Sequence, residues 1–354
     1  MRIAVYTITK NEEQFIKRWA ESCVDADYRL AVDTGSTDNT AQVAVENGCE
    51  VQFITIRPWR FDDARNASLA LIPDDIDICI ALDADEVLQP GWREALEKVG
   101  PTVTRPRYKY VWSWNADGSE GLVYSGDKIH SRFGYRWKHP VHEVLTPTID
   151  EVQGWCDLAI HHYPDNTKPR SQYFPLLELA AKESPDCDRT AHYLAREYYF
   201  HYRFKEAAQE FKRHLSLPSA VWKPERARSM RYLAKCLPNE AEEWLLRATL
   251  EDPGRRENWV DLASYYYNNQ CWPECNYAIG RALRITERSL DYLSESEAWG
   301  AYPYDIGSIA AWHVGLYEQS ILLVQQAIAL DPSNGRLREN LQWMTSNLYN
   351  KTYH

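Results

Sequence analysis

A spacing of 34 residues recurs in the second half of the chain, after about residue 185. It appears in two columns of residues, which are Tyr198, Tyr232 and Tyr266, and Ala207, Ala241 and Cys275. Two columns that share one period indicate an internal repeat, and a unit of this length is a pair of helices. Stacked helix pairs bury a continuous core and usually present their first helices on a concave face. We therefore expect residues 186–354 to form an all-α helical array.

The third unit, WVDLASYYYNNQCWPECNYAIGRAL, resembles the tetratricopeptide repeat (TPR) family. Trp259, Leu262, Ala263 and Tyr266 fall at the positions of the W-x2-L-G-x2-Y pattern of that family. A fourth unit ends in AIALDP after an insertion around SESEAWGAYPYD, and the last helix, RLRENLQWMTSNLY, is expected to cap the array. The resemblance implies a surface for a protein partner or for self-association.

The first half of the chain alternates strands with helices. Short apolar runs predict strands at residues 2–9, 29–34, 50–56 and 75–83, and helical spacing predicts helices at 13–23 and 40–48. Gly48 is expected to end the second of these helices. This alternation indicates right-handed βαβ units and a mostly parallel sheet. Ligands bind at the carboxyl ends of the strands in such sheets.

Composition and charge exclude several classes of protein. The net charge of −11 argues against a nucleic-acid binder that relies on its overall electrostatics. The opening MRIAVYTITKNEE predicts a strand rather than a signal peptide, and no apolar run approaches the roughly 18 residues of a membrane span. The cysteines form no C-x-x-C pair, and Cys271 and Cys275 are interpreted as helix-packing residues. We expect a cytoplasmic, reducing location.

The stretch ICIALDADEV places three carboxylates, Asp83, Asp85 and Glu86, directly after a buried strand. Like charges this close are costly unless a cation lies among them. If the segment is extended, the side chains of Asp83 and Asp85 point the same way and can share one cation. An acidic loop without a ligand is the alternative.

Further polar segments follow the other predicted strands. VDTGSTDNT contains Asp33 and a turn at Gly35, which suits either a plain strand–helix connection or the binding of a nucleotide diphosphate. TITKNEE follows the first strand, and FDDARNASL follows the third. Arg65 offers a fork of donors for a ribose or diphosphate, and its alternative role is an ion pair with Asp62 or Asp63.

These segments, in this order, resemble the family 2 glycosyltransferases of the GT-A fold. The shared patterns are K-N-E-E, D-x-G-S-x-D-x-T, A-R-N and D-x-D. The segment RFGYRWKHPVHEVL resembles an arginine-aromatic stretch that ends in V-H-E in lipopolysaccharide-core and TPR-bearing members, and HHYP stands where those have H-Y-G. Pro164 departs from the glycine of that pattern. The resemblance implies a Rossmann-like α/β GT-A domain over residues 1–180, with the TPR-like array appended.

The resemblance assigns roles to individual residues. It implies nucleotide-sugar binding by Thr9, Asn11, Glu12, Asp33, Gly35, Ser36, Asp62, Arg65, Asp83 and Ala84. It implies binding of Mn²⁺ or Mg²⁺ by Asp85 and His162, with Asp83 at the metal or its water, and oxygen ligands with one imidazole suit these ions. His161 is interpreted as an ordinary loop or sheet histidine.

Inverting transfer also requires a carboxylate that takes the proton of the acceptor. Glu143, in VHEVL, is the best candidate for this general base, with His142 orienting it or touching phosphate. An ion pair of Glu143 with Lys138 or Arg136 is the alternative.

Residues 105–138 form the one locally basic and aromatic region of the chain. Sugar rings and nucleobases both stack on aromatic side chains, so this region is expected to bind the acceptor. The residues in question are Arg107, Lys109, Trp112, Trp114, Arg132 and Arg136. Strands that merely cover the sheet would explain the aromatic residues equally well.

Together with these patterns, the resemblance implies a metal-dependent, inverting glycosyltransferase of the hexosyltransferase type that uses a UDP-sugar. The acceptor is left open among a saccharide, a protein and a hydroxymethylated DNA base. One rival hypothesis is a TPR scaffold with a degenerate transferase domain, which would be expected to lack Asp85 or Glu143. A nucleotidyltransferase is the other, but it would need a glycine-rich loop after the first strand, and TITKNEE contains no glycine.

Overall fold

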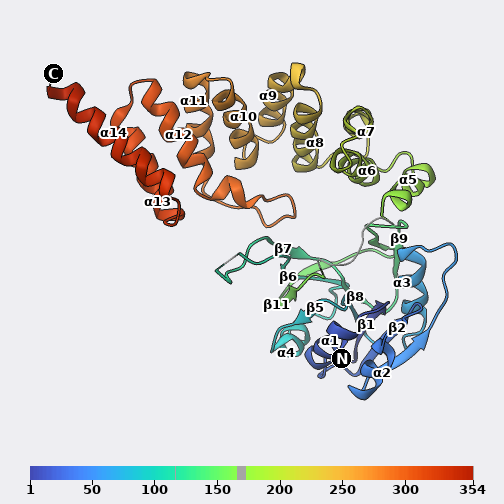
Figure 1. Ribbon diagram of the computed structural model, residues 1–354. Helices are drawn as coiled ribbons and strands as arrows, with labels where there is room; N and C mark the ends of the chain where they lie inside the picture. The colour runs from blue at the N-terminus through green and yellow to red at the C-terminus, as the bar shows by residue number, and fades with distance from the viewer. Residues whose placement is uncertain (116, 166–172, 354) are drawn as a thin grey trace. The chain divides into compact units, whose positions relative to one another are not determined.

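The computed structural model describes residues 1–115, 117–165 and 173–353 (Figure 1). The chain divides into two compact units. The first unit is Met1–Glu183 with Leu290–Tyr292, and the second is Ser184–Ser289 with Leu293–His354. The division at Glu183 falls near the predicted limits at 180 and 186, while Leu290–Tyr292 was not expected in the first unit.

The first unit is built on a five-stranded sheet with the order β3-β2-β1-β4-β8. Its strands are β1 (Ile3–Thr9), β2 (Tyr28–Asp33), β3 (Glu50–Phe53), β4 (Ile78–Ala81) and β8 (Ile129–Ser131). The first four of these run parallel, and β8 pairs antiparallel with β4. The mostly parallel sheet predicted from the sequence is therefore confirmed, and the carboxyl ends of β1, β2 and β4 meet at one edge.

Helices cover both faces of this sheet, because side chains along β1 alternate between two cores. The helices are α1 (Glu13–Ser22), α2 (Thr40–Glu46) and α3 (Phe61–Ala70). Ile3 and Val5 pack into the core that includes α1 and α2, whereas Ala4 and Tyr6 pack into the core on the α3 side. A strand buried on both faces explains the continuous apolar runs in the sequence. Gly48 has φ +78° just beyond α2, as expected for a helix end.

A second, mixed sheet completes the first unit, in the order β5-β11-β6-β7. Its strands are β5 (Glu86–Leu88), β11 (Gln153–His162), β6 (Arg105–Val111) and β7 (Val123–Gly126). The remaining elements are α4 (Trp92–Glu97), α5 (Tyr173–Glu183) and the antiparallel pair of β9 (Tyr135–Lys138) and β10 (Val144–Pro147). Because β5 begins at Glu86, the acidic segment joins the two sheets.

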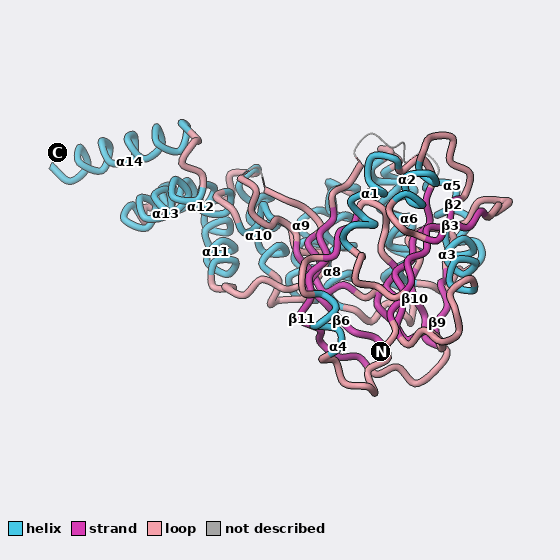
Figure 2. The backbone as a smooth tube through the Cα atoms, turned by 90° about the horizontal axis from the view of Figure 1, so that it is seen from below, coloured by secondary structure: helices cyan, strands magenta, loops and turns pink. Residues whose placement is uncertain are grey.

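The second unit contains helices and no strand among its described residues, as Figure 2 shows by colour. They are α6 (Asp188–Phe200), α7 (Phe204–Ser216), α8 (Lys223–Cys236), α9 (Ala241–Glu251), α10 (Arg256–Asn268), α11 (Trp272–Leu283), α12 (Tyr302–His313), α13 (Tyr317–Leu330) and α14 (Gly335–Tyr353). Helices pack in consecutive pairs, α6 with α7, α8 with α9, α10 with α11 and α12 with α13.

The 34-residue spacing is kept in the second helices of the first three pairs. A turn of 3-10 helix, Pro238–Glu240, precedes α9, so these helical segments begin at Phe204, Pro238 and Trp272. The repeated small residues Ala207, Ala241 and Cys275 are buried within them. The helical array predicted from the repeat is confirmed. None of the described helices is both long enough and apolar enough to span a membrane.

Candidate functional site

The predicted donor-binding segments meet at the carboxyl edge of the parallel sheet. The N–H of Thr34, just after β2, donates to the carbonyl of Thr9 at the end of β1, at 2.9 Å. Asn11 has a positive φ of 57°, and its Oδ1 accepts from the N–H of Thr37 at 2.7 Å. The N–H of Asn11 in turn donates to Ser36 Oγ at 2.9 Å. The loops after β1 and β2 are thus held against each other.

Asp33 closes the turn after β2 and keeps one oxygen unused. Its Oδ1 accepts from the N–H groups of Gly35 and Ser36, both at 2.8 Å. Its Oδ2 is buried and has no hydrogen-bond partner within the described parts of the chain. A buried carboxylate oxygen without a donor is costly, so this atom is suited to a ligand N–H or O–H.

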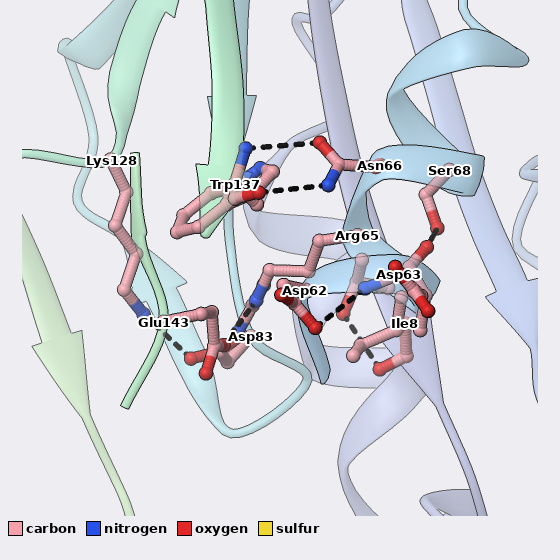
Figure 3. A network of polar contacts seen from close by, with 12 residues as sticks. Ile8, Asp62, Asp63, Arg65, Asn66, Ser68, Asp83, Lys128, Trp137 and Glu143 are labelled. Atoms are coloured by element: carbon pink, nitrogen blue, oxygen red, sulfur yellow. Dashed lines mark hydrogen bonds and ion pairs between the residues drawn. The ribbon is translucent and has the colours of Figure 1, made fainter. Parts of the chain in front are cut away.

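Arg65 lies at the centre of the site, as Figure 3 shows. It is buried on α3, where its Nη2 donates to Asp83 Oδ1 at 2.7 Å and its Nε donates to Glu143 Oε1 at 2.5 Å. Its guanidinium also lies over the ring of Trp137, 4.9 Å from the ring centroid. The alternative ion pair with Asp62 or Asp63 is wrong, because α3 turns Arg65 toward the end of β4. Arg65 Nη1 has no acceptor among the described residues.

Lys128, which the sequence analysis did not identify, lies across the same acidic segment. Its Nζ is 2.6 Å from Asp83 Oδ2 and 2.8 Å from Glu86 Oε1. Glu86 is 1% exposed and also accepts from the hydroxyl of Tyr110 at 2.5 Å. A lone lysine between two strands carries no sequence signal. Only the pairing of β8 with β4 brings it to this place.

The structure corrects the extended conformation expected for Asp83 to Glu86. These residues form a turn, closed by the N–H of Glu86 donating to the carbonyl of Asp83 at 2.9 Å. The side chains of Asp83 and Asp85 therefore do not follow the alternation of a strand. Asp83 pairs with Arg65 and Lys128, whereas Asp85 lies beside His162. Burial favours the neutral acid of Asp83, but the two cations outweigh it and hold its pKa well below the usual range.

Asp85 and His162 form the part of the site that best suits a cation. Asp85 Oδ2 lies 3.3 Å from His162 Nε2. His162 Nδ1 is 2.9 Å from the carbonyl of Trp112, which can only accept, so this nitrogen carries a proton. Burial favours the neutral ring, but the hydrogen bond and charge of Asp85 outweigh it and raise the pKa of His162. Nε2 and Oδ2 thus face each other as two lone pairs unless a proton or a cation lies between them.

The chemistry of this pair fits Mn²⁺ or Mg²⁺. Two ligands of an octahedral cation with bonds of about 2.1 Å lie about 3 Å apart, close to the observed separation. The ion-paired groups Asp83, Glu86, Glu143, Arg65 and Lys128 carry a net charge of −1, and Asp85 makes it −2. One divalent cation would balance that charge.

A different group of three potential metal ligands lies in the described part of the helical array. His192, His214 and Glu225 are buried in the helical array with their ligand atoms within 4.8 Å of one another. Ser229 Oγ lies between the two rings, 2.8 Å from His192 Nδ1 and 2.9 Å from His214 Nδ1. We interpret this group as a buried hydrogen-bonded network, because a serine hydroxyl already connects both imidazoles.

Glu143 precedes β10 (Val144–Pro147), and it pairs with Arg65 rather than with Lys138 or Arg136, the partners of the alternative interpretation. Its side chain is 12% exposed, so it lies near the surface of the site. His142, next to it, has a positive φ of 49° and packs edge-on against Tyr173. The carboxylate that is predicted to act as the base thus shares one guanidinium with Asp83.

The other predicted donor residues have structural contacts. Both oxygens of Asp62 bind Arg60, at 3.1 Å and 3.0 Å, so the carboxylate is already paired. The N–H of Glu12 donates to Thr40 Oγ1 at 2.7 Å, just before α1. Ala84 is buried in the acidic turn. Of these residues, only Ala84 belongs to the segment that carries the candidate cation ligand.

The predicted acceptor residues do not lie together. Trp112 is 39% exposed and stacks on His162 at 4.2 Å, which places it beside Asp85. Trp114 Nε1 donates to the carbonyl of His162 at 3.2 Å. Arg107 and Lys109 alternate with the buried Tyr108 and Tyr110 along β6, and therefore face the other side of the second sheet.

Two more arginines of the predicted acceptor set lie elsewhere. Arg132 is buried and donates to the carbonyls of Ile72 at 2.5 Å and Pro73 at 3.1 Å. It therefore fastens the loop before β4. Arg136 is exposed on β9, where its backbone pairs with Thr146. Among the six predicted acceptor residues, Trp112 and Trp114 have the contacts that connect them to His162.

Comparison with known proteins bears on both units. The glycosyl transferase family 2 model matches residues 4–121. No curated protein matches the chain. Similar solved structures include YrrB, described as a TPR protein with an unusual peptide-binding site, at 13% identity and a TM-score of 0.36 over 47% of this chain and 79% of that one.

Two other solved structures have similar values. PilF of Pseudomonas aeruginosa is 13% identical over 49% of this chain and 72% of that one, with a TM-score of 0.38. The C-terminal part of a TPR repeat-containing protein from Cytophaga hutchinsonii is 13% identical over 52% of this chain and 68% of that one, with a TM-score of 0.42. Residues 4–121 thus match the glycosyl transferase family 2 model, and the second unit is a helical array.

Proposed function

We propose that this protein is a metal-dependent, inverting glycosyltransferase that moves a sugar from a UDP-sugar to an acceptor. The observation that carries the proposal is the meeting of Asp33, Arg65, the Asp83–Asp85 turn and Glu143 at one edge of the parallel sheet. This edge is where α/β sheets bind ligands. A degenerate transferase would be expected to lack Asp85 or Glu143, and both are present.

The donor contacts follow from groups that lack a partner. Asp33 Oδ2 would accept from the uracil N–H or a ribose hydroxyl, since it is a buried acceptor without a donor. Arg65 Nη1 would donate to the diphosphate, because it is the unmatched part of a fork whose other nitrogens hold Asp83 and Glu143. Asp83 has a cation on each oxygen, and the family resemblance is what assigns it a contact with the ribose.

Asp85 and His162 would hold Mn²⁺ or Mg²⁺, with the carbonyl of Trp112 fixing the ring so that Nε2 faces the ion. When bound, the cation supplies positive charge to the leaving diphosphate. Glu143 would take the proton of the acceptor hydroxyl as the sugar is transferred. His142 would orient this carboxylate or touch the diphosphate.

For the acceptor, we propose Trp112 and Trp114 as a stacking surface beside the candidate metal pair. Trp112 is exposed and in contact with His162, so an acceptor ring on Trp112 would lie near the leaving diphosphate. Whether that ring belongs to a saccharide, a glycosylated protein or a modified base is decided by the experiment below. The helical array is proposed to bind a protein partner or a second copy of the chain.

The proposal is tested by measuring hydrolysis of a panel of nucleotide sugars with Mn²⁺ and with EDTA. Hydrolysis of one UDP-sugar that EDTA abolishes is the expected result. Candidate acceptors of the three classes are then added, and product linkage is read by NMR. Absence of hydrolysis or UDP binding across the panel would contradict the proposal.

Glu143→Gln tests the proposed base separately. Gln keeps an oxygen for Arg65 but does not accept a proton from the acceptor, so transfer should fall on the order of 1,000-fold while UDP affinity stays within about twofold. Isothermal titration with UDP and Mn²⁺ measures the second quantity. Transfer at nearly the wild-type rate would return Glu143 to a structural role.

A further inference from the structure

Backbone hydrogen bonds hold Lys128 in place independently of the contacts of its side chain. It lies between β7 (Val123–Gly126) and β8 (Ile129–Ser131). Its carbonyl accepts from the N–H of Ala81, the last residue of β4, at 3.0 Å. Its N–H donates to the hydroxyl of Tyr108 at 3.4 Å. Because β4 leads directly into the acidic turn, the position of the lysine relative to that turn is set by the sheet.

The ammonium group connects the two carboxylates of the turn that do not face His162. Nζ lies 2.6 Å from Asp83 Oδ2 and 2.8 Å from Glu86 Oε1. Glu86 is nearly fully buried, and its Oε2 accepts from the N–H of Asp83 at 2.8 Å. A buried carboxylate of this kind is costly without a cation. Lys128 therefore stabilises Glu86 and, through it, the shape of the turn.

The ammonium group of Lys128 also binds the second carboxylate oxygen of Asp83. Oδ1 is held by Arg65 and Oδ2 by Lys128, so each oxygen already accepts from a cation. A carboxylate in that state is a poor ligand for a divalent ion, and a positive charge nearby opposes the binding of one. Asp85, two residues further, has neither cation as a partner in the described ion pairs.

We propose that Lys128 is a positioning residue that keeps Asp83 out of the metal shell and limits the affinity of the free enzyme for divalent cations. Metal binding is then left to Asp85 and His162 and is completed by the donor diphosphate. This inference rests on the proposed function. It predicts that loss of the lysine charge has opposite effects on metal affinity and on turnover.

Lys128→Met tests the inference, because it keeps much of the side-chain length and removes the charge. The net charge of the site changes from −2 to −3, so Mn²⁺ alone should bind on the order of 10-fold more tightly, as measured by electron paramagnetic resonance of free Mn²⁺. Hydrolysis of the UDP-sugar should fall by on the order of 10-fold or more, because Asp83 is released from its position.

Two variants serve as controls. Lys128→Arg keeps the charge and should retain the Mn²⁺ affinity of the wild type within about twofold. Lys17→Met removes the same charge from an exposed site on α1, paired with Glu21 at 3.9 Å, and should leave Mn²⁺ affinity unchanged. Circular dichroism establishes that each variant is folded.

The outcomes separate the inference from the function on which it rests. Tighter Mn²⁺ binding with slower turnover in Lys128→Met supports it. Unchanged or weaker Mn²⁺ binding in that variant, with a wild type that binds Mn²⁺ and hydrolyses donor, overturns the role of Lys128 alone and assigns the lysine to the donor or to the fold. A wild type that binds no Mn²⁺ even in the presence of UDP overturns both proposals.

Discussion

Two arginines, one in each unit, bridge a pair of carboxylates in nearly the same way. Arg65 binds Asp83 at 2.7 Å and Glu143 at 2.5 Å, and Arg231 in the array binds Asp261 at 2.7 Å and Glu295 at 2.6 Å. Both guanidinium groups are buried. A buried arginine between two carboxylates therefore does not identify a functional site by itself.

The two networks differ in the charge that surrounds the bridge. In the array, Arg228 lies 3.4 Å from Glu295 and Lys235 lies 3.9 Å from Asp261, so the ion-paired groups carry a net charge of +1. In the first unit, the corresponding groups carry −1, and Asp85 makes the sum −2. Negative charge that no Lys or Arg of the network balances is the feature that points to a metal ligand in one network and not in the other.

Replacing one aspartate of each network by asparagine tests this difference most directly. Asp85→Asn should lower donor hydrolysis on the order of 1,000-fold, because the amide cannot supply the anionic ligand. Asp261→Asn should leave hydrolysis within about twofold, since the ion partners of this carboxylate among the described residues are Arg231 and Lys235 of the array. Initial rates at saturating Mn²⁺ and donor give both values. Equal losses in the two variants would mean that the array network contributes to catalysis.

The sequence alone was sufficient to predict the parallel sheet and the edge at which the site lies, because both follow from local periodicity. The alternation of strands and helices is enough to place Asp33, Arg65 and Asp85 at or after the carboxyl ends of successive strands. The contacts of Arg65 were not predictable in this way. They depend on α3 beginning at Phe61, one turn before the arginine, which directs its side chain to Asp83 and Glu143.

Side chains that reach the site from distant strands could not be predicted from the sequence either. Lys128 is 45 residues from Asp83, and only the antiparallel pairing of β8 with β4 brings them together. Arg132, predicted to bind the acceptor, is instead buried against the carbonyls of Ile72 and Pro73. A basic residue in a basic segment does not reveal which face of the fold it meets. The face is decided by the long-range pairing of strands, which the local composition of a segment does not indicate.

Arg231→Met tests how much the bridge in the array contributes to stability. The variant leaves Asp261 and Glu295 partly buried without their main cation, so the free energy of unfolding of the array should fall by about 4 kcal/mol. Urea unfolding followed by tryptophan fluorescence measures this change. Arg213→Met removes a more exposed pair with Glu210 on α7 and should cost less than about 1 kcal/mol. Similar losses in both variants would mean that burial adds nothing to the bridge.

The smallest expected effect concerns a histidine behind the Arg65 network. His130 is fully buried on β8, and Tyr6 Oη lies 3.2 Å from its Nε2. Trp137, over which Arg65 lies, donates from Nε1 to the same hydroxyl at 2.9 Å, which leaves Nε2 of His130 as the acceptor for the hydroxyl proton among these groups. His130 Nδ1 is 2.8 Å from the carbonyl of Ser131. The network therefore needs a neutral ring.

Burial, with smaller contributions from Arg105 and Arg132, lowers the pKa of His130 to about 4. The unfolded chain takes up this proton near pH 6.5, before the folded protein does, so stability present above that pH is lost as the pH falls toward 4. The loss should reach about 3 kcal/mol at most from this group. Urea unfolding of the first unit between about pH 7 and pH 4 should show it, and His130→Gln, which retains an acceptor for Tyr6, should flatten the profile. An unchanged profile in that variant would assign the acid sensitivity to other titratable groups of the first unit.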